Sequence, residues 1–473
     1  RAGRGKAEGD VYSGVGRTSQ PRRAGGVLVG PLVLMLALLL GQGGCSYLST
    51  EPSLAPTIAT ATRAPQPTRT PTPAPTPAAR ANPKAPITLT LWLPPEMAIP
   101  GEEHPGYHVV TDWDAEFLAA HPRVRLETVP KAAYGPGGIV SMVLATQPVA
   151  PARLPDVIAF DTAELSRLAD AGVLQPLDDA LPDSLWAGMY PFALNAVTHG
   201  GQRLAVPFQT DIDILVYDRN AMEDPPSSWE MLLTPRQEGE SAPPTYVFPA
   251  TGNDGSAADA FMVHYLALGG RLTEESGRPY LDSGIAARVL RSYRGAMDAG
   301  VVPDAVRRMR TREECWASFL AGEAQMAHVT TYLFQRDRAS LEGSGYARLP
   351  TVGGHPLVVA RSWAWGVITD DPVRRELAVQ YIETALTPER AVAWGTATAY
   401  LPGQRSVMPA IIEDAPYRRF VDEQLEMALP YPSLSDYGAI QAAVVRAIED
   451  VMDGLATPER AAVTAAAAVV RLR

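Results

Sequence analysis

The chain has 473 residues, 46% of them hydrophobic and 20% charged, a composition that suits two or three globular domains with full cores. Its charge is unevenly divided: residues 1–86 contain ten Lys and Arg against three Asp and Glu, whereas residues 87–473 contain 31 against 49. Nucleic-acid binding needs a basic face, so this acidic body excludes nucleic acid as the expected partner.

The N-terminal part shows the pattern of an export signal. Three arginines between residues 17 and 23 precede an apolar run at 27–40, which is long enough for a signal peptide and short for a membrane span. The following Gly-Gln-Gly-Gly-Cys resembles a bacterial lipobox, although Gln42 stands where that motif usually has an aliphatic residue. We therefore predict a signal peptide at residues 1–45 with lipidation of Cys45. A plain cleaved signal and a short membrane anchor are the alternatives.

Residues 46–86 are dominated by Pro, Thr and Ala and have no apolar period. Such a segment cannot bury a core, so we predict a disordered, partly polyproline tether. Together with a lipid anchor at Cys45, it would hold a folded domain at the outer face of the cytoplasmic membrane. The other cysteine, Cys315, is expected to be a buried helix residue without a disulfide partner.

From residue 87 to residue 200, strand and helix patterns alternate. The predicted strands cover residues 87–92, 124–129 and 156–160, and the predicted helices cover residues 113–120, 139–145 and 165–171. This alternation predicts a mostly parallel sheet covered by helices, because parallel neighbours need a crossover connection.

The stretch from Arg203 to Met222 (RLAVPFQTDIDILVYDRNAM) has a different pattern. Apolar runs at 204–208 and 212–217 flank the polar Gln209-Thr210-Asp211. The second run is rich in β-branched and aromatic residues and too short for a helix. We predict a strand that leaves one packed sheet, crosses an exposed gap and enters another, with Asp211 at the mouth of a cleft. An ordinary strand pair within one α/β domain is the alternative.

Both patterns continue through the rest of the chain. We predict strands at residues 245–249, 325–332 and 357–368, and helices at residues 259–268, 286–297, 315–320, 377–386, 437–454 and 458–472. The tripeptide Thr-Pro-Glu occurs at residues 387 and 457, and each copy predicts a helix start with Thr as N-cap and Pro at the first helical position.

Several short segments stand in a particular order along residues 87–473. They are Leu154–Ile158, Gly172–Asp178, Tyr217–Arg219, Pro226–Trp229, Phe319–Met326, Ala378–Ile382 and Leu386–Glu389. Behind a lipobox and a tether, this set resembles the extracellular solute-binding proteins of ABC importers, the family typified by maltose-binding protein. The resemblance implies two α/β lobes, each a helix-covered, mostly parallel sheet, joined by crossing hinge strands that close on a ligand. It also implies discontinuous lobes, formed by residues 87–209 with 367–400 and by residues 210–366 with 401–473.

The chain lacks the signatures of the common enzyme classes, namely Gly-x-Ser-x-Gly, His-Glu-x-x-His, a Walker loop and the dinucleotide glycine motif. His104 and His108 lie four apart in a Gly- and Pro-rich segment, which is poor metal geometry. Asp211 and Asp213 would project side by side from one strand, whereas glycosidase carboxylates flank the scissile bond. We therefore expect no enzyme activity, no cofactor and no metal site. A secreted hydrolase is the distant alternative.

Sugar binding requires aromatic faces that stack on the apolar faces of the ring, and carboxylates or amides that pair with hydroxyls. The resemblance indicates where such residues should lie: at the carboxyl ends of strands, at the crossing and in the returning hinge strand. The candidates are Phe160, Asp161, Thr162, Asp211, Thr251, Asn253, Asp254, His328, Thr331, Tyr332, Trp365 and Tyr437. Trp92 and Trp229 are instead expected in the core or at a turn.

These observations predict a lipid-anchored extracellular solute-binding protein that captures a small polar solute and delivers it to the transmembrane subunits of an ABC permease. We expect a monomer that binds a small sugar, a polyol or a phosphorylated polyol, because the segments around the site contain few aromatic residues. A ligand-sensing lipoprotein on the same fold, feeding a membrane receptor, is the alternative.

Overall fold

The computed structural model describes residues 86–234 and 244–472. The chain divides into residues 1–78 and the remainder, and every described residue belongs to the second unit. The predicted signal peptide with Cys45, and the predicted tether apart from its last residue, lie outside the described residues. No helix within the described ranges is long and apolar enough to span a membrane.

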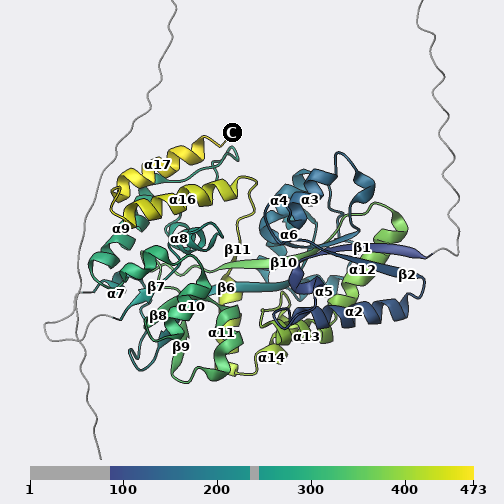
Figure 1. The fold of residues 1–473 in the computed structure, drawn as a ribbon, viewed down its shortest axis with the longest axis horizontal. Helices are drawn as coiled ribbons and strands as arrows, with labels where there is room; N and C mark the ends of the chain where they lie inside the picture. The colour runs from purple at the N-terminus through teal and green to yellow at the C-terminus, as the bar shows by residue number, and fades with distance from the viewer. Residues whose placement is uncertain (1–85, 235–243, 473) are drawn as a thin grey trace, which may run out of the picture. The chain divides into compact units, whose positions relative to one another are not determined.

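One nine-stranded sheet runs through the described unit (Figure 1). Its strands are β1 (Ile87–Leu93), β2 (Val124–Pro130), β3 (Val157–Asp161), β6 (Val206–Asp218), β7 (Tyr246–Val247), β8 (Met326–Thr330), β9 (Ser344–Ala347), β10 (Val359–Val367) and β11 (Leu429–Pro430). They lie in the order β2-β1-β3-β10-β6-β8-β7, with β11 beside β10 and β9 beside β6. A separate ribbon pairs β4 (Thr198–His199) with β5 (Gln202–Arg203).

The sheet is parallel toward both ends of this order and antiparallel in the middle. β1 pairs in parallel with β2 and β3, as the alternation of strands and helices predicts, and all five residues of β3 are buried. Parallel pairs also join β7 to β8 and β11 to β10. Every antiparallel pair within the nine strands involves β6 or β10, so these two strands link two α/β regions.

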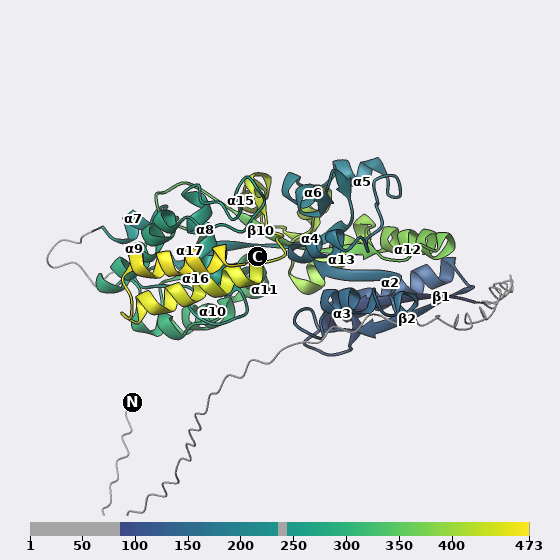
Figure 2. The ribbon, with the colours of Figure 1, turned by 90° about the horizontal axis from the view of Figure 1, so that it is seen from above.

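β6 is the crossing strand that the sequence predicts. Its first half, Val206–Ile212, pairs with β10, and its second half, from Asp213, pairs with β8 and β9. The pairing with β10 shifts by one residue between Trp363 and Ala364, opposite a proline that has no N–H to donate to the ladder. Two lobes joined by crossing strands therefore share one sheet, which confirms the predicted fold class (Figure 2).

Helices cover both lobes (Figure 1). Lobe I, which contains β1, β2 and β3, carries α1 (Pro95–Ala98), α2 (Gly106–Ala120), α3 (Ile139–Thr146), α4 (Leu165–Asp170), α5 (Asp183–Ala187), α6 (Pro191–Val197), α12 (Pro372–Ala385) and α13 (Pro388–Thr398). Lobe II, which contains β7, β8 and β9, carries α7 (Trp229–Leu232), α8 (Ser256–Ala267), α9 (Ser283–Asp298), α10 (Arg312–Leu320), α11 (Thr331–Asp337), α15 (Ala415–Met427), α16 (Tyr437–Met452) and α17 (Pro458–Val470). The short α14 (Met408–Ile411) packs on α13.

The end of β8 differs from the sequence prediction in a way that matters for the site. The predicted strand covers residues 325–332, but β8 ends at Thr330 and α11 begins at the next residue. The Thr330 hydroxyl caps this helix by accepting the N–H of Leu333 at 3.4 Å. Tyr332 therefore belongs to the first turn of a helix, beside the end of a lobe II strand.

Aromatic side chains fill the core. Trp365 is fully buried in lobe I, with its ring centroid 6.2 Å from that of Trp113 and 5.1 Å from that of Phe208. Trp92 and Trp229 are also buried, as expected from the sequence. Trp365 therefore packs in the core of lobe I.

Candidate functional site

A cavity of about 250 Å³ lies where β6 and β10 cross between the lobes. Residues 209–213 of β6 line it, together with Val359, Arg361 and Trp363 of β10. The rest of the wall comes from loops and helices of both lobes. A ligand in this cavity would touch both crossing strands. Because the wall comes from both lobes, a relative motion of the lobes would change the size of the cavity.

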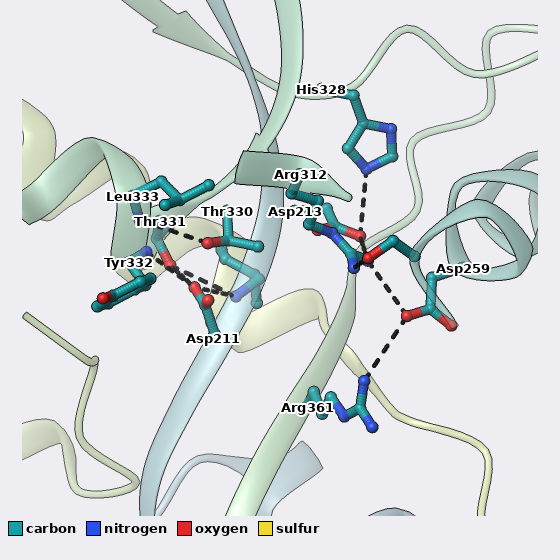
Figure 3. Close-up of polar contacts among 12 residues, drawn as sticks. Asp211, Asp213, Asp259, Arg312, His328, Thr330, Thr331, Tyr332, Leu333 and Arg361 are labelled. Carbon is teal, nitrogen blue, oxygen red and sulfur yellow. Dashed lines mark hydrogen bonds and ion pairs between the residues drawn. The ribbon is translucent and has the colours of Figure 1, made fainter. Parts of the chain in front are cut away.

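Asp211, in the middle of β6, ties the crossing strand to lobe II (Figure 3). Its Oδ1 accepts the Thr331 hydroxyl at 2.5 Å and the Tyr332 N–H at 3.0 Å, both from the first turn of α11, and the Ile212 N–H at 3.0 Å. Burial raises the pKa of Asp211 to about 6, although these hydrogen bonds act in the opposite direction. Among the described residues, no Arg, Lys or His forms an ion pair with this carboxylate.

Replacing Asp211 by Asn should change how stability depends on pH. A carboxyl with a raised pKa in the folded protein binds more protons there than in the unfolded chain, so its contribution to stability falls as the pH rises from about 4 through about 6. Asn keeps an acceptor oxygen but does not titrate. We expect Asp211→Asn to gain on the order of 2 kcal/mol relative to wild type between about pH 4 and pH 7, at about 1.36 kcal/mol per pKa unit. Urea unfolding of both proteins measures this difference, and a gap that stays constant with pH would contradict the assignment.

Arg312, the first residue of α10, holds two carboxylates together (Figure 3). Its Nε and Nη2 donate to the two oxygens of Asp213 at 2.6 and 2.8 Å, and Nη2 lies 3.2 Å from Oδ2 of Asp259. Its Nη1 donates to the Ser256 hydroxyl at 3.0 Å. His328 lies beside the same Asp213, with Nε2 3.2 Å from Oδ2. All three guanidinium nitrogens of Arg312 therefore donate hydrogen bonds to groups of the protein itself.

Burial and charge act against each other in this cluster. Burial alone would raise the pKa of Asp213, but Arg312 and His328 outweigh it and hold that pKa well below its ordinary value. For Asp259 burial prevails over its partners, and the pKa is raised. The side chains of Asp213 and Asp259 are only 12% and 5% exposed, so removing the cation would leave two carboxylates in a site of low polarity.

Arg361 of β10 is the second cation at the cavity. Its Nε donates to Oδ2 of Asp161 at 2.6 Å, and its Nη1 lies 3.8 Å from Oδ2 of Asp259. The guanidinium lies over the rings of Tyr134 and Tyr431, 5.4 and 4.8 Å from their centroids. Asp161 ends β3 of lobe I and Asp259 lies on α8 of lobe II, so this arginine connects charged groups of the two lobes.

The cavity wall is also aromatic, although the sequence segments around the site predict few aromatic residues there. Six aromatic side chains line it: Tyr134, Tyr332, Trp363, Tyr400, Tyr431 and Tyr437. The rings of Tyr332 and Tyr400 stack with centroids 4.6 Å apart and planes inclined by 15°. Tyr437 is 5% exposed, and its hydroxyl has no hydrogen-bond partner within the described part of the chain. The wall therefore offers both ring faces and a hydroxyl that is free to bond a ligand.

A strained backbone precedes Tyr400. Ala399 has φ 62°, and it is the one described non-glycine residue with a positive φ. This left-handed conformation costs an L-residue about 1–2 kcal/mol. Ala399 closes α13 through the bond from its N–H to Gly395, and the turn brings the next side chain back onto Tyr332. Strain of this kind is typical of positions that place a functional side chain.

The structure brings seven of the twelve predicted site residues to the cavity or directly behind it. Asp211, Asp254, Tyr332 and Tyr437 line it. Asp161, Thr331 and His328 stand behind it, bonded to Arg361, Asp211 and Asp213 respectively. These three therefore orient residues that line the cavity.

The other five predicted residues do not line the cavity. Phe160 points to the opposite face of β3 from Asp161 and packs in the core, and Trp365 is fully buried among aromatic rings. Thr162 is buried and donates its hydroxyl to the Ser362 carbonyl at 3.1 Å. Two more lie elsewhere on the surface of lobe II: Thr251, bonded to Glu449, and the exposed Asn253.

Comparisons with known proteins agree with this architecture. Residues 113–417 match the family described as bacterial extracellular solute-binding protein. The maltose-bound MalE3 of T. maritima has the same fold, with a TM-score of 0.65 and 20% identity, over 82% of this chain and 100% of that one.

Two curated relatives match over shorter ranges. The maltotriose-binding protein of Pyrococcus abyssi is 27% identical over 78 residues, which are 16% of this chain and 17% of the relative. A probable ABC transporter-binding protein of Deinococcus radiodurans is 25% identical over 236 residues, which are 46% of this chain and 56% of the relative. The matches span less than two thirds of either relative. The family match, by contrast, covers more than half of this chain. The chain therefore belongs to the bacterial extracellular solute-binding proteins.

Proposed function

We propose that this protein is the solute receptor of an ABC importer and that it binds a small sugar in the cavity at the crossing of β6 and β10. The observation that carries the proposal is the combination of six aromatic side chains with hydrogen-bonding charges in one cavity between two lobes. Aromatic faces remove the apolar faces of a sugar ring from water, and fixed carboxylates and guanidinium groups pair with its hydroxyls.

Individual groups are suited to these roles. Arg361 is 32% exposed and keeps N–H groups beyond its bond to Asp161, so it can donate to a sugar hydroxyl. Three hydrogen bonds to Asp211 end on Oδ1, and the Thr330 hydroxyl is a further neutral partner, so the remaining lone pairs of this carboxylate can accept hydroxyls. The cavity volume of about 250 Å³ lies just below the usual range for drug-sized ligands and favours a mono- or disaccharide.

The relatives support the same ligand class. One curated relative is named for binding maltotriose, and the T. maritima structure contains maltose. We extend sugar binding to this chain because its cavity has the chemistry that a sugar requires, and delivery to a permease because a second relative is named as a transporter-binding protein.

We propose binding without catalysis. The close acid pair Asp213 and Asp259 is held by one arginine, so neither carboxylate is free to act as a nucleophile or a base on a bound sugar. Asp211 has a raised pKa, but three donors occupy its Oδ1, so that oxygen acts as a hydrogen-bond acceptor and not as a proton donor.

Thermal-shift measurements with a panel of sugars test the proposal directly. A ligand that binds only the folded protein raises the melting temperature, by an amount that grows with concentration above Kd. We expect at least one mono- or disaccharide to raise the Tm of wild type, and to raise that of Tyr332→Ala by less. A panel without a single stabilising sugar would contradict the proposal.

The lobes are proposed to close on the ligand about β6 and β10. We assign residues 87–209 with 367–400 to lobe I, and residues 210–366 with 401–473 to lobe II. Because ligand contacts come from both lobes, binding should favour the closed arrangement, and X-ray scattering should give a smaller radius of gyration at saturation. An unchanged radius would indicate a rigid binding module.

Anchoring is proposed from the sequence of the N-terminal part. Lipidation of Cys45, followed by the tether at 46–86, would keep a monomeric receptor at the outer face of the cytoplasmic membrane, beside the permease. A fatty-acid analogue should label wild type and not Cys45→Ala. Equal labelling of both would contradict a lipid anchor at this cysteine.

A further inference from the structure

The charges that line the cavity are strongly unequal. Five carboxylates line it, those of Asp211, Asp213, Asp254, Asp259 and Glu313, against the two guanidinium groups of Arg312 and Arg361. Among the described residues, neither a lysine nor a histidine lines it. A ligand therefore meets an excess of negative charge in a confined space, where charge interactions are stronger than in water.

Both cations are already bound by carboxylates of the protein. Arg312 places three of its nitrogens on Asp213, Asp259 and the Ser256 hydroxyl, and its side chain is 13% exposed. Arg361 is bonded to the buried Asp161 and lies between two tyrosine rings. Neither arginine has a free positive charge to offer an anionic group such as a phosphate, because its charge is offset within the network.

Two of the carboxylates that line the cavity, those of Asp211 and Glu313, have no cationic partner among the described residues. The hydrogen bonds to Asp211 come from neutral groups, namely the hydroxyls of Thr330 and Thr331 and the N–H groups of Ile212 and Tyr332, and no ion pair involves it within the described ranges. Glu313 is exposed and likewise forms no ion pair among the described residues. Asp211 accepts the Tyr332 N–H at 3.0 Å, which places this carboxylate beside the Tyr332–Tyr400 stack, and Glu313 lines the same cavity.

A second observation indicates that this cavity is built for a ligand. The Tyr437 hydroxyl is buried in the cavity wall and lacks a hydrogen-bond partner among the described residues. Buried hydroxyls normally have a partner, so an unpaired one in a cavity wall is suited to a ligand group. It can donate to or accept from a sugar hydroxyl, whereas Asp211 can only accept when ionised.

We propose that the solute is an amino sugar whose protonated amine binds at Asp211, beside Tyr332 and Tyr400. This inference rests on the proposed sugar-binding function and narrows its ligand class. An ammonium group supplies the positive charge that Asp211 lacks and forms charge-assisted hydrogen bonds to its carboxylate. The same charges disfavour the phosphorylated polyol that was among the ligands expected from the sequence, and they disfavour a phosphorylated sugar for the same reason.

Matched sugars test the proposal in calorimetric titrations of the full chain. The probes are glucosamine, galactosamine and mannosamine, each with its N-acetylated form and its uncharged parent sugar, and glucose 6-phosphate as the anionic probe. N-acetylation removes the charge and keeps the nitrogen in place. We expect at least one amine to bind tenfold or more tightly than both of its neutral counterparts, since one charge-assisted bond corresponds to about that factor. Added salt should weaken the amine more than the neutral sugar.

Two variants show whether Asp211 is the source of the preference. In Asp211→Asn the ratio of amine to N-acetyl affinity should fall to near one. Glu275→Gln removes one negative charge from an exposed residue that does not line the cavity, and should keep the wild-type ratio. An unchanged ratio in Asp211→Asn would overturn the assignment to this carboxylate.

The remaining outcomes separate this inference from the proposed function. If neutral sugars bind as tightly as the amines, or glucose 6-phosphate binds more tightly, the amino-sugar inference is wrong and sugar binding stands. If no sugar binds, neutral or charged, both the inference and the proposed function are wrong.

Discussion

Replacing Arg312 by methionine should lower the free energy of unfolding by about 3–5 kcal/mol and abolish ligand binding. Methionine has a similar length but no charge, so Asp213 and Asp259 would remain buried without the cation that they share. Both carboxyls would then take up protons more readily, so the destabilisation should be larger near pH 7 than near pH 5. Urea unfolding at the two pH values measures both effects.

Arg310→Met is the matched control for this variant. Arg310 lies two residues earlier and pairs with Glu314 at 2.8 Å, but its side chain is 67% exposed. Exposed pairs of this spacing contribute less than about 1 kcal/mol, so the control should unfold close to wild type. Equal losses in both variants would mean that the Arg312 network is not the buried charge centre described above.

Two tryptophans on β10 should show opposite effects when replaced by leucine. Trp365 is fully buried among aromatic rings, so Trp365→Leu should destabilise the protein by about 3 kcal/mol, toward the lower end for large aromatic truncations, and change ligand affinity little. Trp363 is partly exposed in the cavity wall, so Trp363→Leu should weaken binding by about tenfold and cost little stability.

Unfolding curves and calorimetric titration of both variants separate stability from binding. The residues are two apart on one strand, so each serves as the control for the other. If Trp365→Leu reduces affinity at unchanged stability while Trp363→Leu binds normally, the cavity is not the ligand site.

The crossing strand could be predicted from the sequence because its pattern is local. Apolar, polar and apolar runs between 204 and 217 indicate a strand with an exposed middle, and β6 changes partners from β10 to β8 and β9 at that place. Asp211 was identified for the same reason. The parallel order of β1, β2 and β3 likewise follows from the local alternation of strands and helices.

The ionic network could not be predicted because its partners are far apart in the chain. Arg312 and Asp213 are separated by 99 residues, and Arg361 and Asp161 by 200. Nothing near Arg312 in the sequence distinguishes it from the exposed Arg310. Arg361 did carry a signal: it is the one charged residue of the predicted strand at 357–368, and a charged residue inside a buried strand requires a partner.

The aromatic wall was missed for a related reason. Tyr134, Tyr400 and Tyr431 lie in loops, where no periodic pattern indicates the direction of a side chain. On β10, the alternation of side chains could not distinguish Trp363 from Trp365, because residues two apart on a strand share a face. The packing of the lobes decides that Trp363 lines the cavity and that Trp365 is buried in the core.

Tryptophan fluorescence during titration with a stabilising sugar tests most directly whether the solute binds in this cavity. All eight tryptophans of the chain are described, and Trp363 is the one among them that lines the cavity. We expect wild type to show a saturable change in emission, and Trp363→Phe, which keeps a ring in the wall, to lose most of that change while still binding the sugar by calorimetry. A Trp363→Phe protein that retains the full change would show that the solute binds elsewhere.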